Sequence, residues 1–162
     1  MGEGNGLPRR IRGLAGFCYN RSPMRARKAR KADLPRIVEL SRSLGLDYPG
    51  MEEDGLWVAE DDGGRVVGAV ALKKHADCLE LCALGVEPAG RGRGTAKALV
   101  EALMAEAPGP VHLATVIPGF FEACGFRAID RDIPASFPAK RATSWCDGCD
   151  RSRCTIMLRT VS

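Results

Sequence analysis

The sequence predicts an α/β domain: a three-layer α/β/α sandwich whose mixed, mostly antiparallel sheet carries helices on both faces. Two observations lead to this fold class. Three apolar runs follow one another over residues 56–86 with only short turns between them, as in an antiparallel meander. Further apolar runs alternate with segments of helical periodicity, so other strands are connected through helices. A chain of 162 residues is long enough to build one such domain around its own core.

The first half of the domain is predicted to begin with a short strand at residues 25–29, followed by a helix. Asp33 is a good N-cap for that helix, Pro35 is tolerated in its first turn, and Gly45 ends it. The strands of the meander are then expected at residues 56–60, 65–72 and 77–86.

The second half alternates helices and strands. Ala96, Leu99, Val100 and Leu103 fall on one helical face at i, i+3, i+4 and i+7, and Pro108 must end that helix. The elements predicted after it are a strand at 111–116, a short helix at 118–123, a strand after the Gly125-Phe126 turn and a closing strand within 154–161.

Residues 1–23 are predicted to be a flexible basic extension, and residues 24–162 to be the domain. The extension mixes Gly, Pro, Asn and Arg with few periodic apolar positions. Its arginines lack the interleaved aromatic residues that stack on bases, which disfavours nucleic-acid binding. No apolar run approaches the roughly 20 residues of a membrane span, and no secretory signal is evident. These features predict a cytoplasmic protein whose seven cysteines are reduced.

A glycine-rich loop carries the first functional signal. Residues 91–96, Arg-Gly-Arg-Gly-Thr-Ala, fall where a strand ends and a helix begins, so backbone N–H groups and the positive helix end point at one spot. Two arginines add charge, which predicts a site for a pyrophosphate. The loop lacks the Lys-Ser/Thr ending of a Walker A motif and the glycine spacing of a dinucleotide-binding fingerprint.

The segment 86–96, Val-Glu-Pro-Ala-Gly-Arg-Gly-Arg-Gly-Thr-Ala, resembles the acetyl-CoA-binding motif R-x-x-G-x-G/A of the GNAT N-acetyltransferases. The resemblance extends to Phe120–Phe126 and to the segment around Asp33, and covers roughly residues 24–129. It implies a GNAT-like fold and acetyl-CoA as co-substrate. Backbone amides of the loop would hold the pyrophosphate, the edge of the strand at residues 84–86 would pair with the pantetheine arm, and amides at Ala83 and Leu84 would polarise the thioester carbonyl. The residues expected to bind the coenzyme are Leu84, Val86, Arg91, Gly92, Arg93, Gly94, Thr95 and Ala96.

Glu80 is the candidate general base. It lies in the third strand of the meander, where related histone acetyltransferases and N-acetylglutamate synthase-like members carry a glutamate. An amine must lose a proton before it attacks a thioester, and a carboxylate can take that proton directly or through water. The alternative is a solvated residue on the outer face of the strand.

The general acid stays open, because Phe121 stands where many family members carry a tyrosine that reprotonates the leaving thiolate. Water, Cys124 and Tyr48 are the alternatives. Cys82 or Cys124 would be the nucleophile of a ping-pong route, but direct attack in a ternary complex is favoured because free cysteine usually packs as a small hydrophobe. His75 and His112 are read as structural.

A cysteine-rich tail begins at about residue 143. Cys146, Cys149 and Cys154 have the spacing of a structural zinc site that would need a fourth ligand from elsewhere. The same arrangement resembles the tail of short N-acetylglutamate synthase-like proteins, which favours an amino acid such as glutamate as acceptor, with Arg127, Lys140 or Arg141 binding its carboxylates.

The sequence therefore predicts an acetyl-CoA-dependent N-acetyltransferase acting on a primary amine of a small molecule. Two alternatives are kept: a non-catalytic acyl-CoA or metal-binding module, and an acetyltransferase that acts on a protein or ribosomal target. The oligomeric state, including a homodimer, is left open by the sequence.

Overall fold

The computed structural model describes residues 24–162, so the extension predicted over residues 1–23 lies outside the described residues. Seven strands form one sheet: β1 (Arg25–Lys28), β2 (Gly55–Glu60), β3 (Val66–Lys74), β4 (Leu79–Val86), β5 (Val111–Thr115), β6 (Arg127–Ala128) and β7 (Thr155–Arg159). The helices are α1 (Leu34–Ser43), α2 (Thr95–Glu106), α3 (Pro118–Ala123) and α4 (Ser136–Arg141). Short 3-10 turns are η1 (Lys31–Asp33), η2 (Met51–Glu53), η3 (Pro88–Gly90), η4 (Ser144–Cys146) and η5 (Arg151–Arg153).

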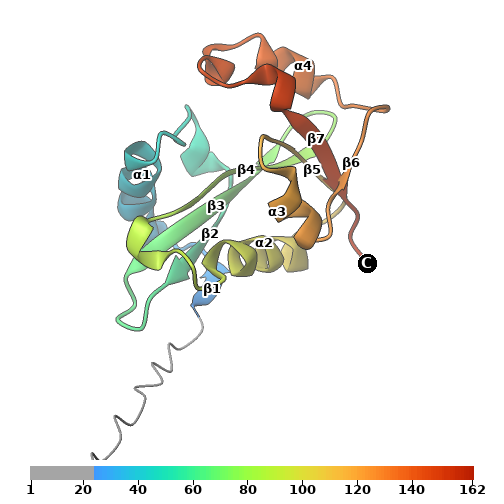
Figure 1. Ribbon diagram of the computed structural model, residues 1–162. Coiled ribbons are helices and arrows are strands. Elements are labelled where there is room, and N and C mark those ends of the chain that lie inside the picture. Colours follow the sequence, from blue (N-terminus) through green and yellow to red (C-terminus); the bar gives the residue numbers. More distant parts are fainter. Residues whose placement is uncertain (1–23) are drawn as a thin grey trace, which may run out of the picture.

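The strand order is β1-β2-β3-β4-β5-β7-β6, and every neighbouring pair is antiparallel except β4 and β5. This arrangement confirms the predicted mixed, mostly antiparallel sheet (Figure 1). The meander is formed by β2, β3 and β4, whereas α2 carries the chain from β4 to its parallel neighbour β5.

Two hydrophobic clusters lie on opposite faces of the sheet. Within β2, Trp57 and Ala59 belong to one cluster while Val58 belongs to the other, because successive side chains of a strand point to opposite faces. Leu99 and Leu103 of α2 are fully buried in the first cluster, and each contributes about 1.5–3 kcal/mol of burial free energy. Helix α1 packs into the second cluster. The helices on the two faces produce the predicted three layers.

Strands β4 and β5 are paired over a very short length. Leu79 pairs with Val111 and Glu80 pairs with His112, and no further pairs join the two strands. Beyond Glu80 the edge of β4 that faces β5 is therefore released from the sheet, while its other edge stays paired with β3. This divergence leaves an open strand edge in the middle of the sheet.

A bulge marks the released half of β4. Ala69 of β3 pairs with Gly85 and Ala71 pairs with Cys82, so Ala83 and Leu84 together face one residue of β3. Ala83 has a φ of 50°, a conformation that costs a residue with a side chain about 1–2 kcal/mol. The surrounding sheet therefore holds this backbone in a strained conformation.

Helix α4 was not predicted, because six residues containing Pro138 give no helical periodicity. Tertiary contacts hold it instead. The backbone N–H of Ser136 donates to Asp77 Oδ2 at 3.2 Å, the Cys78 thiol lies 3.3 Å from the Ser136 hydroxyl, and Phe137 is buried. Helix α4 and the turns after it extend from one end of the sheet (Figure 1). Between residues 24 and 162, none of the helices combines the length and apolar character needed to cross a bilayer.

Candidate active site

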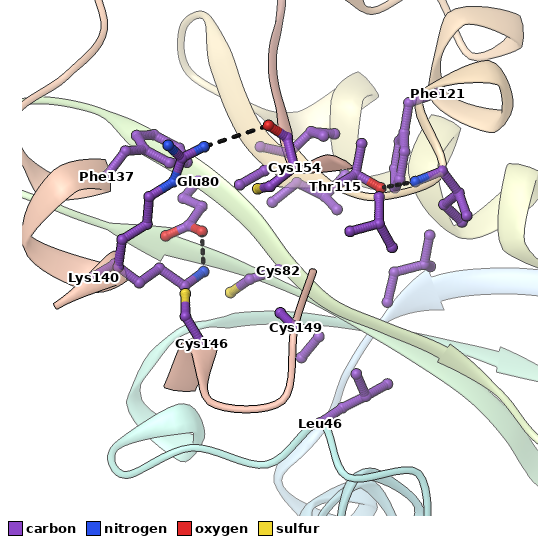
Figure 2. A pocket seen from close by; sticks show the side chains of 18 of the residues that line it. Leu46, Glu80, Cys82, Thr115, Phe121, Phe137, Lys140, Cys146, Cys149 and Cys154 are labelled. Carbon is purple, nitrogen blue, oxygen red and sulfur yellow. Dashed lines mark hydrogen bonds and ion pairs between the residues drawn. The ribbon is translucent and has the colours of Figure 1, made fainter. Parts of the chain in front are cut away.

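A cavity of about 340 Å³ lies where β4 and β5 diverge. Its walls come from β4, β5, α3, α4 and the cysteine-rich tail, elements that are far apart in the sequence. Much of the lining is apolar, including Leu46, Leu84, Leu113, Ile117, Phe121 and Phe137. The charged side chains of the wall are Glu80, Lys140, Arg141 and Arg151. Glu80 and Lys140 are labelled in Figure 2.

Glu80 is the buried carboxylate of this cavity, with only 2% of its side chain exposed. Its Oε2 lies 2.7 Å from His75 Nε2, and its Oε1 forms an ion pair with Lys140 Nζ, drawn as a dashed line in Figure 2. The outer-face alternative for Glu80 is therefore wrong, since the side chain points into the cavity. A buried carboxylate needs such donors to compensate for lost hydration.

His75, which the sequence predicts to be structural, contacts the candidate base Glu80. It lies in the turn between β3 and β4, and its backbone N–H donates to the Cys78 carbonyl at 2.8 Å, which holds the turn. Its side chain is 18% exposed, so it connects the buried Glu80 with the surface. A lone histidine forms no recognisable motif in the sequence. The turn between β3 and β4 reverses the chain and so brings His75 next to Glu80, five residues later.

Positive charge gathers at the cavity from the C-terminal part of the chain. Lys140 and Arg141 lie on α4, and Arg151 lies on η5. The guanidinium of Arg141 donates to the Cys154 carbonyl at 3.5 Å, which joins α4 to the tail. Arg127, which the sequence grouped with Lys140 and Arg141, is instead an exposed residue of β6 and does not line the cavity.

Cys146, Cys149 and Cys154 all line the cavity, but the predicted metal site is not reproduced. Within residues 24–162, no three His, Cys, Asp or Glu side chains are arranged to hold a metal ion. The 3-10 turns η4 and η5 fold the tail so that its cysteines occupy separate parts of the cavity wall (Figure 2). The tail therefore contributes part of the cavity wall, with Cys146, Cys149 and Cys154 among its lining residues.

The candidates for a general acid lie in different places. Phe121 is buried and lines the cavity, but it carries no proton to donate. Tyr48 lies behind the cavity wall: the Cys82 thiol donates to its Oη at 3.4 Å, and its own hydroxyl donates to Asp54 Oδ2 at 2.5 Å. Burial raises the pKa of Tyr48 well above its ordinary value. Cys124 is buried outside the cavity lining.

The glycine-rich loop has the form that the sequence predicted. Gly92 and Gly94 have φ values of 74° and 73°, a region that favours glycine. The hydroxyl of Thr95 donates to the Gly90 carbonyl at 2.7 Å, and Arg91 Nε donates to the Val86 carbonyl at 2.9 Å. The first bond holds Thr95 against η3, and the second ties the loop to the end of β4. Helix α2 begins at Thr95, and the N–H groups of its first turn have no partner within the helix.

Comparison with known proteins agrees with this geometry. Residues 52–128 match the model of the acetyltransferase (GNAT) domain family. N-acetylglutamate synthase from Neisseria gonorrhoeae, solved with coenzyme A and N-acetyl-glutamate, superposes with a TM-score of 0.67 at 21% identity over 86% of this chain. This chain spans only 35% of that enzyme's length.

Two further structures align with this chain over nearly all of their own length. Rv2747 from Mycobacterium tuberculosis, solved with CoA, has 25% identity, a TM-score of 0.64 and coverage of 85% of this chain and 99% of its own. A phosphinothricin acetyltransferase of the GNAT superfamily from Sinorhizobium meliloti, solved with AcCoA, has 19% identity, a TM-score of 0.59 and coverage of 87% and 90%. The diverging β4 and β5, the glycine-rich loop and the match of residues 52–128 to the acetyltransferase (GNAT) domain family are features that this chain shares with GNAT acetyltransferases.

Proposed function

We propose that this protein transfers the acetyl group of acetyl-CoA to the primary amine of an amino acid such as glutamate, by direct attack in a ternary complex. The observation that carries the proposal is the buried carboxylate of Glu80 in a cavity whose other charged side chains are cations. Such a site offers a proton acceptor for the amine and positive charge for carboxylates of the same substrate.

The glycine-rich loop and the open edge of β4 support a binding mode for the coenzyme. The pyrophosphate would lie against the amides of residues 91–96, where two left-handed glycines allow close approach. The pantetheine arm would run along residues 84–86, whose edge toward β5 carries no strand pairing. The bulge at Ala83 and Leu84 turns backbone amides out of the ladder, where they would stabilise the oxyanion of the tetrahedral intermediate.

The acceptor class follows from charge. Three cations and one carboxylate line the cavity, so an acceptor that carries carboxylates is bound better than a polyamine. Arg141 and Arg151 present guanidinium groups, which bind carboxylates with two parallel hydrogen bonds. The acceptor's ammonium group would take the place of Lys140 beside Glu80.

The proton then leaves through Glu80. A free alkylamine has a pKa near 10, so its ammonium form must lose a proton before the nitrogen attacks. Glu80 takes that proton, and His75, 2.7 Å from Glu80 and partly exposed, passes it toward solvent. The leaving group is a thiolate of low basicity, about that of cysteine, so its departure does not require a tyrosine at the position of Phe121.

A ping-pong route through Cys82 is disfavoured by its surroundings. Burial raises the pKa of the Cys82 thiol to about 11. A thiol with such a pKa is almost entirely protonated at neutral pH, and the thiolate is the nucleophilic form.

Titration of the purified protein with acetyl-CoA, followed by release of free thiol from the mixture, tests the proposal. Glutamate, aspartate, glutamine, arginine and spermidine form the acceptor panel. Thiol release should be fastest with an acidic amino acid, and Glu80→Gln should lower kcat by about 100-fold or more while retaining acetyl-CoA binding. Glu122→Gln is the matched control, because Glu122 is an exposed carboxylate of α3 outside the cavity lining.

Two outcomes would contradict the proposal. Binding of acetyl-CoA without release toward any amine would favour the non-catalytic module. Release that is fastest with spermidine would refute the acceptor class while leaving the chemistry in place. The cytoplasmic location stays a prediction from the sequence, and a homodimer stays open.

A further inference from the structure

Lys140 places a primary amine in the cavity that the proposed function assigns to the acceptor. Its Nζ is paired with Glu80, the group that would take a proton from any amine bound there. The side chain is 22% exposed and lies on the wall of the cavity (Figure 2). An internal amine therefore occupies the position expected for the substrate's ammonium group.

We propose that Lys140 is itself an acetyl acceptor, so that the protein acetylates its own Lys140 when acetyl-CoA is bound and no amino-acid acceptor fills the cavity. The inference rests on the proposed function, because it uses the same coenzyme site and the same base.

The position of Lys140 distinguishes it from the other lysines. The chain has six lysines, and Lys140 is the one that lines the cavity. Lys28, Lys31, Lys74 and Lys97 are exposed, and Lys73 lies over the ring of Tyr48 at 4.5 Å from its centroid. A general reaction of acetyl-CoA with surface amines would therefore modify the exposed lysines first.

The reach of the side chain is compatible with transfer. Glu80 and the bulge at Ala83 belong to the same strand and both line the cavity, with three residues of strand, about 10 Å, between their Cα positions. Lysine carries its ammonium on a flexible four-carbon stem. Rotation of this stem changes the position of Nζ along the cavity wall, on which Glu80, Ala83 and Lys140 all lie.

The step balances as an ordinary acyl transfer. Glu80 takes a proton from the Lys140 ammonium, and the neutral Nζ forms a bond to the thioester carbonyl carbon. The C–S bond breaks, the coenzyme leaves as a thiolate, and a proton is returned to its sulfur. The products are the acetyl amide of Lys140, free coenzyme A and one proton released to solvent.

The modification would change the site. An acetylated Lys140 has no charge, so Glu80 loses an ionic partner and the cavity loses one of its three cations. A protein modified in this way should bind an acidic acceptor more weakly. Self-acetylation would thus lower activity when coenzyme is abundant and acceptor is scarce.

Mass spectrometry of the full-length protein incubated with acetyl-CoA tests the inference. Cleavage before aspartates releases the fragment 132–146, in which Lys140 is the one lysine. Its acetylation should be at least about tenfold faster than that of any other lysine, and Glu80→Gln should slow it by about tenfold or more. Lys140→Arg should leave this fragment unmodified, whereas Lys31→Arg, at an exposed lysine, should leave its rate unchanged.

The contrary outcomes are distinct. If thiol release with an amino acid proceeds while the fragment 132–146 stays unmodified, the inference is wrong and the proposed function stands. If Lys140 is acetylated no faster than Lys31, or equally fast with Glu80→Gln, the modification is surface chemistry and the inference fails. If neither the amino acid nor Lys140 receives acetyl groups, the proposed function and the inference fail together.

Discussion

The pair formed by Glu80 and Lys140 should respond unequally to loss of either partner. Lys140→Met removes the ammonium but keeps most of the apolar stem. Oε1 of Glu80 then loses its ionic partner and faces the thioether of the methionine. Because only 2% of the Glu80 side chain is exposed, water cannot replace that partner. Glu80→Gln keeps the shape of the other partner and leaves an ammonium whose side chain is 22% exposed and can reach water.

The expected magnitudes follow from this asymmetry. Breaking a fully buried pair costs about 3–5 kcal/mol, because a charge is left without compensation. His75 still lies 2.7 Å from Glu80 and retains part of the compensation, so Lys140→Met should cost about 2–4 kcal/mol. Glu80→Gln should cost about 1 kcal/mol, since the amide oxygen can still accept from Lys140.

Urea unfolding measures the difference. With a slope of about 2 kcal/mol per molar urea, Lys140→Met should lower the midpoint by about 1–2 M and Glu80→Gln by about 0.5 M. The double variant should be more stable than Lys140→Met alone, because it buries no unpaired carboxylate. If Lys140→Met proves no more destabilising than Glu80→Gln, or if the two effects simply add, the buried carboxylate does not depend on Lys140 and the reasoning is refuted.

Three further predictions concern the glycine-rich loop, the mechanism and the pH dependence of stability. Gly94→Ala should weaken acetyl-CoA binding about fivefold in titration calorimetry without changing kcat. The added Cβ meets no atom within 4 Å, so the expected cost is about 1 kcal/mol of backbone energy at a φ of 73°. Unchanged affinity would contradict this prediction. Cys82→Ala should retain acetyl transfer within about threefold, and abolished transfer would restore the ping-pong route. Burial lowers the pKa of His112, so below an unfolded pKa of about 6.5 the unfolded chain binds a proton that the folded one resists. The contribution of His112 to stability is therefore full above that pH and is lost as the pH drops below it. In urea unfolding between about pH 5 and 7, His112→Leu should flatten this loss of stability. If the pH dependence of stability is unchanged in the variant, the loss belongs to other groups.

Much of the fold was readable from the sequence because its signals are local. The spacing of Leu99 and Leu103 predicted α2, and its observed bounds agree with the stop set by Pro108. The glycines of the loop need left-handed backbone, and that need depends on a few neighbouring residues only. The placement of Glu80 on the third strand of the meander likewise followed from strand order and motif spacing.

The remainder depended on which segments meet in space. No periodicity marks α4, and its position follows from contacts with Asp77 and Cys78, 58 or more residues away along the chain. The zinc site stays a prediction for a related reason: ligand spacing in sequence is necessary for a metal site, but the turns η4 and η5 decide where each thiol lies, and residues 24–162 show no group of three ligands.

The sequence by itself determined the layers, the glycine-rich loop and the candidate base, since periodicity, glycine placement and motif order act over a few residues. Only the tertiary structure decided that His75 and Lys140 flank Glu80 and that Arg151 lines the same cavity. A lone histidine or lysine carries no local signal for a partner. Such partners are fixed by the free energy of burying a carboxylate, which must be balanced by whichever donors the folded chain brings within reach.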